Sequence, residues 1–374
     1  MGFATLDDEY PWDALAPFAE RARRHPRGLV DLSIGTPVDP TPAVVREALV
    51  AAADAPGYPT THGTAALRES VSDWFARRRG VPGLDPDAVL PTVGSKEAVA
   101  LLPSLLGLGP GDVVVHPETA YPTYDVGARL AGATPLAADD VAAWEGRSDV
   151  RLVWVNSPAN PHGAVHPVEH LQRVVAAARR ISAVVVSDEC YAELAWTEPW
   201  TASGVPSLLD PRVSGGSHEG LLVAYSLSKQ SNVAGYRAAF LAGDGGLVAE
   251  LVRLRKHMGM IVPAPVQAAM TVALRDDEHV AAQRAVYARR RELLLGGLAA
   301  AGLVVDHSEA GLYLWVRPDG GAQDCWQTVS DLADLGILVG PGVFYGEAGR
   351  GHVRVALTAS DERVAEAAAR LSGA

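Results

Sequence analysis

The sequence contains few lysines and few cysteines, and it has fewer positively than negatively charged residues. Of its 32 cationic residues only three are lysines, namely Lys96, Lys229 and Lys256. Because arginine supplies almost all of the positive charge, each lysine is a candidate for a role that needs an amine. The formal net charge is −12. A surface of that sign argues against nonspecific binding to nucleic acid, which basic surfaces hold.

The two cysteines, Cys190 and Cys325, give neither a disulfide framework nor a metal-binding spacing. We therefore expect a reducing compartment and no metal. No apolar run approaches the roughly 20 residues that cross a bilayer. Residues 1–10 lack the basic flank and apolar core of a signal peptide. These absences predict a cytoplasmic protein without a membrane partner.

Short apolar runs alternate with helical patterns from residue 88 to about residue 260. The candidate strands are 88–93, 112–115, 151–155, 183–187, 221–225 and 237–242. This alternation predicts an open α/β fold with a mostly parallel central sheet and helices on both faces.

The pattern changes after residue 265. A long helical region, with a break expected near Asp276 and Asp277, precedes candidate strands near 303–306, 312–316, 337–339 and 352–357. We expect a smaller α+β domain here. The predicted boundaries are 1–45 for an N-terminal arm and part of the small domain, 46–265 for the large domain and 266–374 for the small C-terminal domain.

Ligands of open α/β sheets bind beyond the carboxyl ends of the strands. Ser226, Ser228 and Lys229 follow the strand predicted at 221–225, and Arg237 comes eight residues after the lysine. Two hydroxyls and a guanidinium suit a phosphate, and a lysine of lowered pKa forms Schiff bases. The alternative, that Lys229 is a surface charge, is disfavoured by the rarity of lysine.

Two glycine-containing turns are further candidates. Gly94, Ser95 and Lys96 open a predicted helix, whose free amides either bind phosphate or are capped by the serine in the ordinary way. Gly35 follows a short predicted strand. It is either an ordinary turn glycine or a point where the backbone approaches a ligand closely.

Other polar or aromatic residues also follow predicted strands. Asp188 and Tyr191 come after 183–187, Asn160 lies in a proline-rich loop after 151–155, and Tyr121 follows 112–115. Arg354 lies inside an apolar strand, where an arginine needs a carboxylate partner. That partner is either internal or the substrate.

Together these groups describe a ligand with a phosphate, a flat ring, a ring nitrogen, a ring hydroxyl and an aldehyde, which is pyridoxal 5′-phosphate. The whole chain resembles the class I/II (fold type I) aminotransferases, which have a large domain and a smaller α+β domain. The residues that carry the resemblance are Tyr58 with Gly63, Leu67 and Arg68, then Gly94, Ser95 and Lys96, Tyr121, residues 157–163, Asp188, Tyr191, Ser226, Ser228, Lys229, Arg237 and Arg354.

The resemblance implies roles for these residues. Lys229 would hold the cofactor covalently and move the substrate α-proton, while Asp188 would keep the ring nitrogen protonated. Asn160 and Tyr191 would bond the ring hydroxyl, and Tyr121 would stack on the ring. The groups assigned to the phosphate are Gly94, Ser95, Lys96, Ser226, Ser228 and Arg237.

The resemblance also implies how substrate and subunits are arranged. Gly35, Asn160 and Arg354 would lie on the substrate side, with Arg354 holding the α-carboxylate. Tyr58 would reach the cofactor phosphate of a neighbouring subunit, which predicts a homodimer. His162 departs from the family, which usually has threonine at this position of the loop.

A narrower resemblance is to the succinyldiaminopimelate aminotransferases of lysine and diaminopimelate biosynthesis. It is carried by residues 11–15, 32–40, 256–267 and 306–315. It implies ping-pong transamination between N-succinyl-LL-2,6-diaminopimelate and 2-oxoglutarate, with glutamate as the other amino acid. Another class I/II aminotransferase, or a C–S lyase, uses the same scaffold and stays open as an alternative. A cofactor-binding regulator is disfavoured by the acidic N-terminus, and a nicotinamide dehydrogenase by the lack of its glycine fingerprint.

Overall fold

The computed structural model describes residues 11–321 and 323–373. The first part of the predicted N-terminal arm, and the segment searched for a signal peptide, lie outside the described residues. Within the described residues, no helix is both long enough and apolar enough to cross a lipid bilayer.

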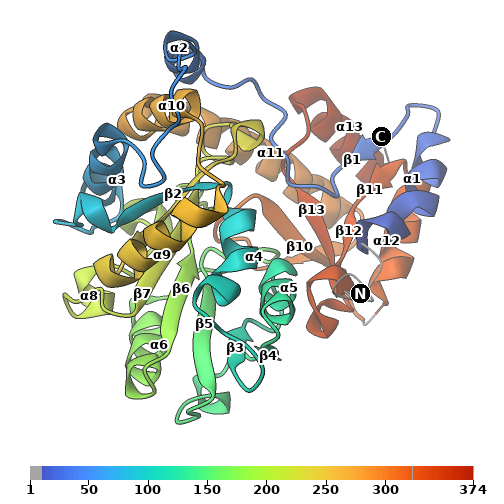
Figure 1. The fold of residues 1–374 in the computed structure, drawn as a ribbon. Coiled ribbons are helices and arrows are strands. Elements are labelled where there is room, and N and C mark those ends of the chain that lie inside the picture. Colours follow the sequence, from blue (N-terminus) through green and yellow to red (C-terminus); the bar gives the residue numbers. More distant parts are fainter. Residues whose placement is uncertain (1–10, 322, 374) are drawn as a thin grey trace, which may run out of the picture.

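The largest sheet in the described residues has seven strands, in the spatial order β2-β8-β7-β6-β5-β3-β4 (Figure 1). All neighbouring strands are parallel except β8, which runs antiparallel to both β2 and β7. This confirms the predicted mostly parallel sheet. The strands are β2 (Val89–Val93), β3 (Val113–His116), β4 (Thr134–Ala137), β5 (Val150–Asn156), β6 (Val184–Asp188), β7 (Leu221–Ser226) and β8 (Ala238–Gly243).

Helices cover both faces of this sheet because successive strand side chains point to opposite faces. Val153 and Val155 pack in one core, with α3 (Ala65–Arg78), α6 (Val168–Arg180) and α10 (Ala264–Arg275). Leu152 and Trp154 pack in the other, with α4 (Ser95–Leu105), α5 (Thr123–Leu130) and α9 (Gly245–Met258). The near-continuous apolar run of β5 is therefore the signature of a strand buried on both faces.

A second, antiparallel sheet in the described residues has the order β12-β13-β10-β9. Its strands are β9 (Leu303–Asp306), β10 (Tyr313–Pro318), β12 (Gly340–Pro341) and β13 (Val353–Ala356). Its core also contains side chains of α1 (Ala16–Arg23), α11 (Glu278–Ala300), α12 (Cys325–Asp334) and α13 (Asp361–Leu371). Asp276 and Asp277 separate α10 from α11, as the sequence predicts.

The beginning of the described chain packs with its end. Strand β1 (Val30–Asp31) pairs in parallel with β11 (Ile337–Leu338), and α1 lies beside α12 (Figure 1). The remaining elements are the helices α2 (Ala43–Ala51), α7 (Trp200–Ser203) and α8 (Pro211–Ser214) and the 3₁₀ segments η1 (Pro11–Leu15), η2 (Pro86–Ala88), η3 (Val141–Ala143), η4 (Ala234–Tyr236), η5 (Gly342–Tyr345) and η6 (Glu347–Gly349).

The loop that follows β5 is fastened to the turn that precedes β10. The carbonyl oxygen of Gly163 accepts hydrogen bonds from the backbone N–H groups of Glu309 (3.1 Å) and Ala310 (2.9 Å). Gly163 has φ +73°, and a Cβ there would lie 2.5 Å from the carbonyl oxygen of Ala310. Only glycine allows this approach. The contact brings the carboxyl end of β5 close to the four-stranded sheet.

Candidate active site

Lys229 lies in the loop after β7, and its Nζ donates a hydrogen bond to the carbonyl oxygen of Gly35. Burial lowers the pKa of the Lys229 amine, and the positive charges of Arg354 and Arg237 act in the same direction. A lowered pKa increases the fraction of neutral amine, which is the form that attacks a carbonyl carbon. The structure thus places the half-buried candidate lysine next to Gly35.

The groups predicted to bind phosphate come from two separate stretches and meet in the structure. The hydroxyl of Ser226 donates to Oγ of Ser228 at 2.8 Å. The N–H of Gly94 donates to the carbonyl oxygen of Arg237 at 2.8 Å. A Cβ added to Gly94 would lie only 2.0 Å from Nη2 of Arg237. The guanidinium therefore lies directly against the N-terminus of α4, where free amides and the helix dipole favour an anion.

Asp188 is the last residue of β6 and is buried. Its Oδ2 accepts a hydrogen bond from the hydroxyl of Tyr124 at 2.9 Å, and its Oδ1 accepts one from the N–H of Cys190 at 3.2 Å. Burial raises the pKa of Asp188, although both bonds favour the charged form. A cationic N–H group placed beside this carboxylate would lower its pKa again.

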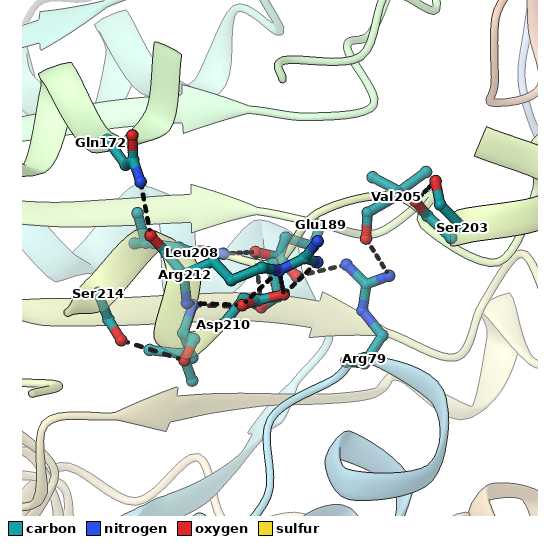
Figure 2. Close-up of polar contacts among 12 residues, drawn as sticks. Arg79, Gln172, Glu189, Ser203, Val205, Leu208, Asp210, Arg212 and Ser214 are labelled. Carbon is teal, nitrogen blue, oxygen red and sulfur yellow. Dashed lines mark hydrogen bonds and ion pairs between the residues drawn. The ribbon is translucent and has the colours of Figure 1, made fainter. Parts of the chain in front are cut away.

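The residue that follows Asp188 is anchored by a buried ion pair (Figure 2). Oε2 of Glu189 accepts a hydrogen bond from Nη2 of Arg79 at 2.8 Å, and both side chains are 1% exposed. Oε1 of Glu189 accepts from the N–H of Leu208 at 2.8 Å, and Nη1 of Arg79 donates to the carbonyl oxygen of Val205 at 2.9 Å. The end of α3 and the loop before α8 thereby fix the chain next to Asp188.

Two asparagines organise the loop after β5. Nδ2 of Asn156 donates to the carbonyl oxygen of Asp188 at 3.0 Å, and Oδ1 of Asn156 accepts from the N–H of Asn160 at 2.7 Å. Oδ1 of Asn160 in turn accepts from Nη1 of Arg354 at 3.0 Å. The loop therefore connects two residues that the sequence analysis singled out separately, Asp188 and Arg354.

Arg354 is 4% exposed. Its Nη2 donates to the carbonyl oxygen of Ser33 at 2.7 Å. The centre of its guanidinium lies 4.0 Å from the ring centroid of Tyr313 and 4.8 Å from that of Tyr345. Within residues 11–321 and 323–373, no carboxylate pairs with Arg354 and its buried Nε has no hydrogen-bond partner. The described residues thus contain no internal carboxylate partner for this arginine.

Tyr313 is a residue that the sequence analysis did not select for the site. Its hydroxyl lies 3.1 Å from that of Tyr191, and a Cβ on Gly35 would lie 2.0 Å from it. Tyr313 therefore touches the surroundings of Lys229 and Arg354 together. Tyrosine at the start of an apolar strand is usually a packing residue, so periodicity gave no signal for a site role.

Four other predicted residues lie at the edge of this cluster or outside it. Tyr121 precedes α5 and packs edge-to-face on Tyr124, with ring centroids 5.9 Å apart. Ser95 is the first residue of α4, and Lys96 beside it is exposed. Tyr58 is fully exposed in this single chain. The structure therefore does not bring Tyr58 to the Lys229 cluster of its own chain.

His162 replaces the usual threonine in the loop after β5. Its Nδ1 accepts a hydrogen bond from the N–H of Ala164 at 3.3 Å, and its ring centroid lies 5.5 Å from that of His307. Burial lowers the pKa of His162 to about 4, and the charges of His307 and His352 add to the effect. The imidazole is therefore neutral at neutral pH, with Nδ1 acting as an acceptor.

Comparisons with a family model and with known proteins all match this chain to aminotransferases. Residues 27–371 match the family model described as aminotransferase class I and II. The chain is 55% identical over 364 residues to the 4-dedimethylamino-4-oxo-anhydrotetracycline transaminase OxyQ of Streptomyces rimosus, covering 97% of this chain and 99% of that protein. It is also 55% identical to the probable aminotransferase Rv1178 of Mycobacterium tuberculosis, covering 97% and 85%.

A solved structure agrees with these sequence matches. The probable N-succinyldiaminopimelate aminotransferase of Thermus thermophilus superposes with a TM-score of 0.85 at 29% identity, covering 97% of this chain and 99% of that one.

Proposed function

The chain belongs to the class I and II aminotransferases, and we propose that it transfers an amino group between N-succinyl-LL-2,6-diaminopimelate and 2-oxoglutarate. The family match confirms the broader resemblance, to the class I/II aminotransferases. The observation that carries a transaminase assignment is the convergence of Lys229, Asp188 and Arg354 on one site from three different strands or strand ends.

Aminotransferases of this family use pyridoxal 5′-phosphate, and the residues of this chain fit it. A Cβ at Gly94 would collide with Arg237, so glycine lets the guanidinium lie against the N-terminus of α4, a place that favours an anion. Asp188 is a buried carboxylate at the end of a strand, which suits a ring N–H. When bound, the cofactor supplies an electron sink for the carbanion that forms at the substrate α-carbon.

We assign the reaction steps to this chain's own groups. The Lys229 amine, with its lowered pKa, would take the proton from the substrate α-carbon and pass it to C4′ of the cofactor. Asp188 would hold the ring nitrogen in its charged form, and the Tyr124 hydroxyl, which donates to Oδ2, orients the carboxylate. Asn160 and Tyr191 would bond the ring hydroxyl, and Tyr121 would stack on the ring.

Arg354 is proposed to hold the substrate α-carboxylate. A guanidinium presents its N–H groups in one plane and binds a carboxylate through two of them. Two of the Arg354 N–H groups are used by Asn160 and by the Ser33 carbonyl oxygen. The remaining N–H groups, including the buried Nε–H, are available for a ligand. We assign Gly35, which lies beside Tyr313 and Lys229, to the same substrate side.

The substrate assignment rests on the narrower sequence resemblance and on the likeness to a probable N-succinyldiaminopimelate aminotransferase. A second candidate is an amino transfer to a keto group on a polycyclic ring, because the 55% identity to the anhydrotetracycline transaminase is much higher than the 29% to that structure. A C–S lyase on the same scaffold is the third alternative.

A substrate panel separates these candidates. The purified holoenzyme is assayed with glutamate and, in turn, the keto acid that corresponds to N-succinyl-diaminopimelate, an anhydrotetracycline ketone and other keto acids. We expect 2-oxoglutarate formation to be fastest with the succinylated keto acid. A preference for the ring ketone would favour the second candidate. Release of pyruvate and ammonia from a thioether amino acid, without 2-oxoglutarate, would favour a lyase.

We also propose that the active form is a cytoplasmic homodimer with shared sites. The Tyr58 side chain is fully exposed, and Val50 and Val38, earlier in the same stretch of sequence, are 71% and 53% exposed. A second copy that covers these residues would place Tyr58 at the neighbouring phosphate cradle. Solution scattering should give the mass of a dimer, whereas an active monomer would refute this. We further propose that the chain divides into an N-terminal arm with part of the small domain (1–45), a large cofactor-binding domain (46–265) and a small C-terminal domain (266–374).

A further inference from the structure

We propose that Tyr313 is a positioning residue, which holds the plane of the Arg354 guanidinium so that its N–H edge faces the α-carboxylate of the substrate. The inference rests on the proposed function of Arg354 and adds a residue to which the family resemblance gave no role. It starts from the observation that Tyr313 is in contact with the cluster at both of its ends.

The ring of Tyr313 contacts the flat face of Arg354. The centre of the guanidinium lies 4.0 Å from the ring centroid, a distance at which a buried cation is attracted by the aromatic quadrupole. Arg354 is on β13 directly opposite Trp315 on β10, so Tyr313 is its diagonal neighbour across the two strands. Diagonal pairs are within reach of aromatic side chains.

The hydroxyl of Tyr313 is held at the other end of the side chain. It lies 3.1 Å from the hydroxyl of Tyr191, and Gly35 has no space for a Cβ beside it. The side chain is 4% exposed. A tyrosine confined at both ends cannot swing away, so the face that it presents to Arg354 is fixed.

The geometry explains why a ring suits this place better than another polar group. A ring contact occupies the face of the guanidinium and consumes none of its N–H donors. Asn160 and Ser33 each accept one hydrogen bond from Arg354, which leaves the buried Nε–H without a partner in the described residues. Tyr313 can therefore fix the plane while the in-plane donors stay available for two carboxylate oxygens.

Two reagents test this inference without any assumption about the natural substrate. Aminooxyacetate and methoxyamine both attack the carbon that would join the cofactor to Lys229 and release the lysine amine, but only aminooxyacetate carries a carboxylate. The ratio of their second-order rate constants, followed by the absorbance of the holoenzyme, measures carboxylate recognition. Arg354→Ala defines the ratio when recognition is lost.

Tyr313→Leu removes the ring, and the matched Tyr313→Phe keeps it. We expect Tyr313→Leu to lower the aminooxyacetate rate constant by about 10- to 30-fold, the range of a buried cation–π contact. The methoxyamine rate constant should stay within about 2-fold of the wild-type value, because methoxyamine has no carboxylate for Arg354 to bind. Tyr313→Phe should keep most of the preference for aminooxyacetate.

Several outcomes would overturn the inference. One is a Tyr313→Leu enzyme with the wild-type ratio of rate constants. Another is an equal loss of rate with both reagents, which would indicate a merely structural role. The third is a Tyr313→Phe enzyme that is as impaired as Tyr313→Leu. If Tyr313→Leu does not fold by circular dichroism, Tyr313→Met carries the same expectation. If the Arg354→Ala enzyme gives the same ratio of rate constants as wild type, that result would instead contradict the proposed function of Arg354.

Discussion

Arg354 donates a hydrogen bond from Nη1 to Oδ1 of Asn160 at 3.0 Å, across 194 positions of sequence. The bond joins β13 of the four-stranded sheet to the loop after β5 of the seven-stranded sheet. It orients an arginine that has no carboxylate partner in the described residues beside a loop that also contacts Asp188. The proposed carboxylate and cofactor sites thus share one hydrogen-bonded chain of residues.

Replacing Arg354 should mainly weaken the capture of carboxylate substrates. We expect Arg354→Ala to raise the KM of the amino donor by about 10- to 150-fold, the cost of about 1.5–3 kcal/mol for hydrogen bonds to a charged group. Arg354→Lys keeps the charge but not the planar fork, and should fall between wild type and alanine. Steady-state kinetics measures this, and an unchanged KM in Arg354→Ala would contradict the assignment.

Replacing Asp188 should slow the chemical step and leave the cofactor bound. Without a buried carboxylate the ring nitrogen loses its charged partner, so we expect Asp188→Ala to lower kcat by at least about 100-fold. Absorbance of the purified protein should still report bound cofactor. A Tyr124→Phe variant, which removes only the hydrogen bond to Oδ2, should show a smaller loss. A kcat near wild type in Asp188→Ala would remove Asp188 from this role.

The buried pair of Arg79 and Glu189 should matter for stability. Removing one partner leaves an unpaired charge in the interior, so Arg79→Met should lower the free energy of unfolding by about 3–5 kcal/mol. The double variant Arg79→Met/Glu189→Gln should recover part of this loss, because the unpaired Glu189 charge is removed as well. Arg147→Gln, which breaks an exposed pair with Asp149, is the control and should change nothing measurable. Urea unfolding tests all three, and a mild effect of Arg79→Met would contradict the expectation.

His162 should make the protein sensitive to mild acid. Its pKa is about 4 in the folded chain and about 6.5 in an exposed histidine. Below pH 6.5 the unfolded chain therefore binds more protons at this position, so its contribution to stability is complete above pH 6.5 and is lost as the pH falls toward 4. The loss between pH 7 and pH 5 is about 2 kcal/mol.

His162→Thr, which restores the residue usual in the family, should reduce the difference in unfolding free energy between pH 7 and pH 5 by that amount. Urea unfolding at the two pH values measures it. Wild type and variant with the same pH dependence would show that His162 is not the responsible group.

Much of the fold was visible in the sequence because buried strands read as short apolar runs. The strand β4 (Thr134–Ala137) was missed, since it is a partly exposed edge strand that contains a proline. The direction of β8 was not predicted either. Its connection from β7 contains only a 3₁₀ segment, and without a crossover helix an antiparallel pairing follows.

The position of a candidate was predictable where a polar residue ends or follows a strand, as with Asp188, Asn160 and Lys229. Tyr313, Tyr345 and the carbonyl oxygen of Ser33 were not, because their contacts with Arg354 form only when the strands and loops pack together. An aromatic residue in an apolar strand, or a backbone oxygen, carries no signal in a single sequence. The same holds for the pairing of Arg79 with Glu189.

The most direct test of the account is the identity of the lysine that carries the cofactor. The holoenzyme is reduced with borohydride, digested and examined by mass spectrometry. Lys229, with its lowered pKa and half-buried position, should carry the pyridoxyl group, while Lys96 and Lys256 stay unmodified. Lys229→Ala should retain no covalent label and no transaminase activity. A label on another lysine, or an active Lys229→Ala enzyme, would contradict the central claim.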